Sequence, residues 1–211
     1  MSSTQPVRGR PVGSRGEDTR RRIIAATMRC VAEVGYSRAT IREIARVAQM
    51  TSGSLYHYFP NKSDLIKAAF VELAEISVPR LATAADQASG VLDKLMAVFD
   101  EGDQLMRDYP HASAFDRALR AESPANLHLV EDSDAIFTSF REVIVGIIEQ
   151  ADREGALGVG TDVESAANAV YALMQGLYDH AAAVPPDQYH ATVRASKLLI
   201  GGALFDYAKF A

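Results

Sequence analysis

The chain has 211 residues, 48% of them hydrophobic, which is enough to build a buried core, and its single cysteine, Cys30, excludes an internal disulfide and a Cys-x-x-Cys metal or redox site. No run of 18 apolar residues occurs, which argues against a membrane span, and we expect a soluble, cytoplasmic protein. The net charge of −5 hides an asymmetry, because residues 1–67 hold 12 Lys and Arg against 5 Asp and Glu whereas the remainder holds 10 against 22. This division predicts a basic head that approaches phosphate groups and an acidic body that does not.

Residues 1–16 are rich in Gly, Pro, Ser and Arg, and they hold too little apolar surface to order themselves. We therefore expect a disordered basic tail. Within it, Arg8-Gly9-Arg10-Pro11 resembles the core of an AT-hook, whose arginines lie along a narrow DNA minor groove. Arg8 and Arg10 are accordingly predicted to bind DNA, and the alternative is a tail that only improves solubility.

A helix is predicted from Glu17 to Gly35, because apolar residues recur at helical spacing and Gly35 provides a stop signal. Cys30 lies on the apolar side and is interpreted as a core residue, with a redox sensor as the alternative. Three consecutive arginines at 20–22 follow the acidic start, and we expect at least one of them to face the DNA backbone.

Residues 40–59 predict two short helices joined by a tight turn. Thr40 can cap the first helix, and Glu43 stands where a capping box requires it to reach back to the N–H of Thr40. Thr51 or Ser52 can cap the second helix. Two amphipathic helices with so short a connection are typical of a helix-turn-helix, whose second helix places its first turn in the major groove.

The next helix is predicted to begin after Asn61, which can cap it, so that Lys62 lies at a helix N-terminus suited to phosphate. Pro79 is expected to kink or end this helix. Beyond it, helical periodicity without a competing strand signal predicts an all-α body. The helices of the body are expected at 91–108, 111–121, 125–154, 163–183 and 187–208.

The segments Thr40–Ala45, Gly53–Phe59 and Asn61–Leu65 resemble the DNA-binding domain of TetR-family transcriptional regulators, and the resemblance covers about residues 17–77. It implies an N-terminal three-helix, helix-turn-helix DNA-binding domain and a larger C-terminal helical domain for ligand binding and dimerisation. The expected division is 1–16 for the tail, 17–77 for the DNA-binding domain and 78–211 for the ligand-binding and dimerisation domain.

The resemblance also implies which residues meet DNA. Phosphate contacts are expected from Thr40, Tyr56 and Lys62, with a core position as the alternative for Tyr56. Many family members carry a lysine where this chain has Ser52, which suggests a weaker attraction to phosphate here. Contacts at or near base edges are expected from Arg42, Thr51, Ser52, Gly53, Ser54 and His57.

The last two predicted helices carry broad apolar faces and several glycines, which resembles the dimer interface of the same family. The alternative is the core of a monomer. Polar or aromatic residues interrupt the apolar stripes of the body at positions that in this family often line a ligand cavity, and the alternative for each is a satisfied surface or interface residue. The predicted ligand-binding residues are His111, Arg117, Arg120, His128, Phe137, Tyr171, Gln175 and Tyr178.

No metal-spaced cluster and no hydrolase, zinc-protease or nucleotide-loop motif occurs, so we expect neither an enzyme, a metal site nor a cofactor. The predicted function is that of a DNA-binding transcriptional regulator, a repressor that binds a palindromic operator as a homodimer and is released by a small hydrophobic effector. The alternative is an all-helical protein-interaction module without sequence-specific DNA binding. Salt-dependent, sequence-selective DNA binding distinguishes the two.

Overall fold

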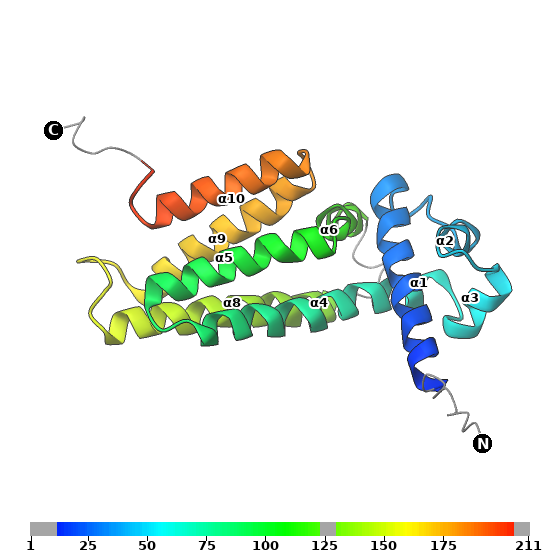
Figure 1. Ribbon diagram of the computed structural model, residues 1–211, viewed down its shortest axis with the longest axis horizontal. Helices are drawn as coiled ribbons and strands as arrows, with labels where there is room; N and C mark the ends of the chain where they lie inside the picture. The colour runs from blue at the N-terminus through cyan, green and yellow to red at the C-terminus, as the bar shows by residue number, and fades with distance from the viewer. Residues whose placement is uncertain (1–11, 123–129, 205–211) are drawn as a thin grey trace, which may run out of the picture.

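A computed structural model describes the backbone of residues 12–122 and 130–204, and the side chains of residues 16–122 and 138–204. All regular structure in these ranges is helical, as predicted (Figure 1). The first three helices form a head at one end, and a longer helical body extends away from it. The helices are α1 Val12–Val34, α2 Ile41–Val47, α3 Ser52–Tyr58, α4 Lys62–Gln87, α5 Val91–Asp108, α6 Ala112–Arg120, α8 Val130–Arg153, α9 Val163–Ala181 and α10 Pro186–Ile200.

Short polar side chains begin the helices of the head. The Oγ1 atom of Thr40 accepts the Glu43 N–H at 3.2 Å, and that of Thr51 accepts the Ser54 N–H at 3.0 Å. Asn61 Oδ1 does the same for the backbone N–H at the third position of α4, at 2.8 Å. These caps at 40 and 61 are confirmed, and of the two options for α3 the structure uses Thr51.

The second half of the predicted capping box is absent. Instead of reaching back to Thr40, the Glu43 carboxylate accepts a hydrogen bond from Arg46 Nη2 at 2.6 Å. A charged partner one turn further along the helix competes with a neutral backbone N–H for the same oxygen atoms, and the charge-assisted bond is the stronger of the two.

Three helix boundaries differ from those expected. α1 begins at Val12 rather than Glu17, so part of the predicted tail is helical. α10 ends at Ile200 rather than 208, where Gly202 adopts a left-handed φ of 69°. α4 continues through Pro79 to Gln87. Both Pro79 and Glu75, whose carbonyl loses its helical donor, are exposed, so water can satisfy that carbonyl.

The head has its own core beneath the turn between α2 and α3. Ile23 of α1, Ile44 of α2 and Leu55 of α3 are fully buried in it. Cys30 is 2% exposed in the same cluster, and burial raises the pKa of its thiol. The predicted core role of Cys30 is therefore confirmed, and a thiol kept protonated in this way is poorly suited to redox sensing.

The body packs five helices around a second core. α4 and α5 lie against α8, α9 packs on α8, and α10 contacts α5 and α9 (Figure 1). Because α4 also packs on α1, it is shared by head and body. No described helix has the length and apolar character needed to cross a membrane.

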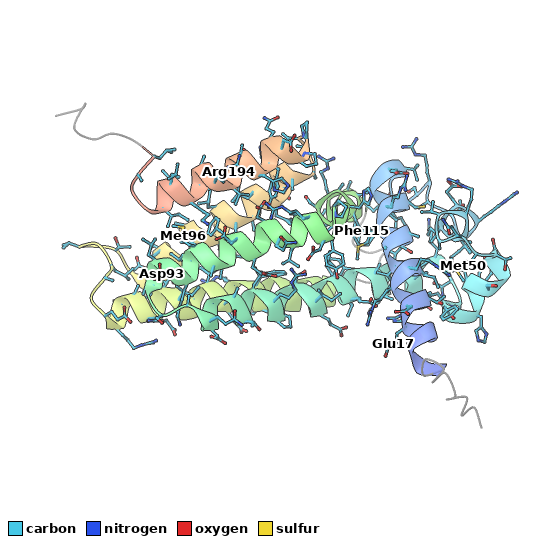
Figure 2. The ribbon with its side chains drawn as sticks, viewed as in Figure 1. Glu17, Met50, Asp93, Met96, Phe115 and Arg194 are labelled. Carbon is cyan, nitrogen blue, oxygen red and sulfur yellow. The ribbon has the colours of Figure 1, made fainter. Side chains whose placement is uncertain are left out.

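The junction between head and body is built on α6. Phe115 is fully buried in a cluster with Ile24 and Met28 of α1 and Phe70 of α4 (Figure 2). Ser37, in the connection after α1, donates a hydrogen bond to Glu122, just beyond α6, at 2.7 Å. The head is therefore held to the body by apolar packing on α6 as well as by the shared helix α4.

Candidate functional site

The outer face of α3 is polar and open. Leu55 and Phe59 are buried and fix the helix to the head core, which excludes them from contact with a partner. Tyr56 is 53% exposed, so its hydroxyl projects outward and the core alternative for this residue is wrong. Gly53, Ser54 and His57 are exposed beside it.

Residues at the two helix starts complete this surface. Arg42, on the first turn of α2, and the two caps Thr40 and Thr51 are all exposed, and Ser52 is partly exposed. The hydroxyls of Thr51 and Ser54 lie 2.9 Å apart and hydrogen bond to each other. The predicted residues from 40 to 57 are thus exposed or partly exposed on the head, and their contact with DNA stays a prediction.

A shallow hollow separates α3 from the first half of α1. On the α1 side it is lined by Thr19 and Arg22, and on the other side by Met50, Gly53, Ser54, His57 and Tyr58. Thr19 and Tyr58 were not among the predicted residues. Only helical spacing in the sequence could have indicated these two residues. Thr19 lies one turn before Arg22 on α1, and Tyr58 lies one turn after Ser54 on α3.

The three arginines at the start of α1 point in different directions. Arg20 lies 3.4 Å from the Glu72 carboxylate and stacks over the Phe59 ring, and Arg21 is near acidic residues of its own helix. Arg22 is the one that faces the hollow beside α3. The sequence does not reveal the ion pairs of Arg20 and Arg21, so it could not select Arg22 among the three arginines.

Lys62 is held closely against the connection between α1 and α2. Its Nζ donates to the backbone carbonyl of Tyr36 at 2.9 Å and lies 4.3 Å from the centre of the Tyr36 ring. An ammonium group has three donors, so this bond leaves capacity for a phosphate oxygen. Arg8 and Arg10 lie outside the described residues.

The body contains a partly open cavity of about 120 Å³ next to the junction cluster. Phe70, Leu73 and Ala112 belong both to the lining and to the cluster that packs on α1. The rest of the described lining is largely apolar or aromatic and comes from α4, α5, α6, α8, α9 and α10. Such a cavity suits the apolar part of a small molecule.

The predicted ligand residues fall into three groups. Tyr171, Gln175 and Tyr178 line the cavity from α9. His111, Arg117 and Arg120 lie at the start or on the outer side of α6 and do not line it. His128 and Phe137 lie outside the residues whose side chains are described.

Asp116 is a cavity residue that was not predicted. It is 5% exposed, and its Oδ2 lies 2.7 Å from Arg120 Nη2. Burial raises the pKa of this carboxyl against the opposing effect of Arg120. The sequence could have pointed to Asp116, because helical periodicity places this charged residue beside Phe115 and Leu119 on the interior side of α6. Among the described residues, no group of His, Cys, Asp and Glu is arranged to hold a metal ion.

Comparison with known proteins gives a consistent result. Residues 23–69 match the family model described as bacterial regulatory proteins, tetR family. The chain is 26% identical over 150 residues to the fatty acid metabolism regulator protein of Bacillus subtilis, covering 71% of this chain and 76% of that one. It is 27% identical over 144 residues to the transcriptional repressor KstR2 of Mycolicibacterium smegmatis, covering 67% of each.

A solved structure shares the whole architecture. The transcriptional regulator FadR from Bacillus subtilis, in complex with stearoyl-CoA, superposes with a TM-score of 0.71 at 21% identity. The match covers 88% of this chain and 99% of that one. This likeness concerns the fold, and it includes both the head and the body.

Proposed function

Because the chain belongs to the TetR family of transcriptional regulators, we propose that it is a repressor that binds a palindromic operator as a homodimer and is released by a small hydrophobic effector. The observation that carries the proposal is the exposed polar face of α3, held on a basic head by Leu55 and Phe59. The hydroxyl groups and the glycine of α3, together with the nearby Arg42, form a polar, low-profile surface that fits into a major groove.

Contacts to DNA divide into two kinds in this proposal. Thr40, Tyr56 and Lys62 bind phosphates and set the register, whereas the first turn of α3 and Arg42 lie against base edges. Arg22 lines the hollow between α1 and α3, and it adds a phosphate contact from α1. The tail of residues 1–16 reaches the minor groove through Arg8 and Arg10.

A homodimer is supported by the outer surface of α10. Leu198 and Leu199 are 49% and 48% exposed near its end, and Leu204 just beyond it is 39% exposed. Exposed large apolar side chains at the end of a surface helix are typical of an interface. A two-fold dimer through this surface presents two copies of α3 to two half-sites, which is why the operator is expected to be palindromic.

Release of DNA is supported by the position of α6. One side of this helix packs Phe115 on α1, and another places Asp116 at the cavity. A ligand that occupies the cavity therefore acts on the helix that also supports the head. The effector releases DNA only if it binds more tightly to the conformation in which the heads do not fit the operator.

The proposed domain boundaries separate DNA binding by the head from ligand binding and dimerisation by the body. We assign residues 1–16 to the tail, 17–77 to DNA binding and 78–211 to ligand binding and dimerisation, with α1 crossing the first boundary and α4 the second. The long α4 connects the two domains without interruption.

Selection of genomic fragments by the purified protein at two salt concentrations, with sequencing of the retained DNA, tests the proposal. A single palindromic motif, bound less tightly at the higher salt concentration, is expected. Retention without a motif, or no retention, would contradict it and favour a helical protein-interaction module.

A further inference from the structure

The cavity has a polar wall and an apolar wall. Tyr171, Gln175 and Tyr178 recur at helical spacing along one face of α9, and Asp116 of α6 lies at the same side, where α6 packs on α9. The facing wall is formed by apolar residues of α4 and α5, among them Leu73 and Val98. On the α4 side the polar lining residue is Ser77, whose hydroxyl donates to the Leu73 carbonyl, so a molecule in this cavity meets a carboxylate only on the side of Asp116.

Asp116 is the charged residue of the described lining, and it is incompletely compensated. The guanidinium of Arg120 approaches Oδ2 at 2.7 Å, but the contact lacks the alignment of a hydrogen bond. The raised pKa of Asp116, which burial causes, agrees with a carboxylate that lacks sufficient partners.

The same lining is unfavourable to an anion. Neither Lys nor Arg belongs to the part of it that the structure describes. An anionic head group placed against Asp116 would bring two negative charges together in a site of low dielectric constant. Tyr171, Tyr178 and Tyr189, by contrast, contribute aromatic rings to the lining, and aromatic rings attract cations.

The size of the cavity limits the apolar part. An engineered apolar cavity of about 150 Å³ holds benzene. The cavity of about 120 Å³ here has room for a body of similar size without rearrangement.

We propose that the effector is a small lipophilic amine, with an apolar body about the size of one ring on the α4 and α5 wall and an ammonium group that donates a hydrogen bond to Asp116. The proposal rests on the proposed function, because it names the ligand of the same regulatory cavity. It differs from the acyl-CoA thioester bound by FadR, whose phosphate groups are anionic.

Three probes of matched shape test the proposal: 2-phenylethylamine, 2-phenylethanol and phenylacetate. Binding of each to the full-length protein is measured by isothermal titration calorimetry at pH 7.5. The amine is expected to bind about tenfold more tightly than the alcohol, since a charge-assisted hydrogen bond is about twice as strong as a neutral one. Phenylacetate is expected to bind most weakly. Tightest binding of phenylacetate, equal binding of all three probes, or binding of none would overturn the proposal.

The variant Asp116→Asn tests whether Asp116 causes the preference for the amine over the alcohol. It is expected to lose the tenfold advantage of the amine over the alcohol, whereas Asp152→Asn, an exposed aspartate of α8, keeps it. An unchanged preference in folded Asp116→Asn would overturn the assignment.

The failure of this inference is distinguishable from failure of the proposed function, because calorimetry requires no DNA. Selective DNA binding without amine binding would overturn the ligand class alone. Amine binding without selective DNA binding would support the ligand class and overturn the repressor.

Discussion

Phe115 and Asp116 are consecutive residues of α6, and they serve different parts of the molecule. Phe115 is fully buried against α1 of the head, whereas Asp116 lines the cavity of the body. Neighbouring residues on a helix point about 100° apart, so one short helix can contact both. Adjacent side chains of α6 therefore contact the cavity and the DNA-binding domain.

Arg42 and Lys62 are expected to contribute differently to DNA binding. Lys62→Ala should weaken binding to all sequences and reduce the slope of log affinity against log salt by about 1, because it removes a phosphate contact. Arg42→Ala should cost about 1–3 kcal/mol on the operator and less on other sequences. Fluorescence anisotropy with operator and random DNA over a salt series measures both effects.

The matched control is Lys94→Ala, which removes a cation from α5 in the body and should leave binding unchanged. Because Lys62 also holds the Tyr36 carbonyl, thermal unfolding of each variant is needed to show that the head stays folded. Identical changes in affinity and sequence preference for Arg42→Ala and Lys62→Ala would contradict the division into positioning and reading contacts.

Leu198 tests the dimer. Leu198→Glu should convert the protein to a monomer in sedimentation velocity and weaken operator binding by about 10²-fold or more, since the second half-site no longer benefits from effective concentration. Leu92→Glu is the control, because Leu92 is 48% exposed on α5, close to the 49% of Leu198. A dimer that survives Leu198→Glu would place the interface elsewhere.

The pH dependence of stability tests the environment of Asp116. Burial raises the pKa of this carboxyl, so the folded protein holds its proton more tightly than the unfolded chain does. The contribution of Asp116 to stability is therefore largest below its ordinary pKa of about 4 and is lost as the pH rises through the raised value. Besides burial, Asp179 raises this pKa, and Arg120 lowers it.

Asp116→Asn removes this dependence. The difference in Tm, variant minus wild type, should become more positive as the pH increases from 4.5 to 8, whereas Asp152→Asn should give a nearly constant difference. Circular dichroism melts across the pH series measure it. A difference that becomes more negative with pH would mean that the ion pair with Arg120 outweighs burial.

Local rules predicted much of the fold, because caps act over a few residues. Thr40, Thr51 and Asn61 mark helix starts in the sequence and in the structure. Helical periodicity also placed α5 at 91–108, as observed. Pro79 does not end α4, which was one of the two effects predicted for it, because the carbonyl one turn earlier is at an exposed residue, and that exposure is a tertiary property.

The site was less accessible to sequence reasoning for the same reason. The DNA-facing residues of α3 were expected from the resemblance to the TetR family, whereas the selection of Arg22 among three arginines depends on the partners of Arg20 and Arg21. Periodicity could place Asp116 on the interior side of α6, but its position at the cavity depends on how α6 packs on α9.

The central claim is that filling the cavity in the body weakens DNA binding by the head, and Gly102 allows a direct test. Gly102 lines the cavity on α5, and a Cβ atom there would meet no other atom within 4 Å. Gly102→Phe therefore places a ring in or beside the cavity without a ligand. Gly146→Phe, at an exposed glycine of α8 with equally open surroundings, is the matched control.

The decisive measurement is the operator affinity of these two variants by fluorescence anisotropy, with circular dichroism to establish that both fold. The account predicts that Gly102→Phe binds the operator at least about fivefold more weakly than wild type, the lower end of typical allosteric coupling, and that Gly146→Phe binds as wild type does. Unchanged affinity of a folded Gly102→Phe protein, or equal loss in both variants, would contradict it.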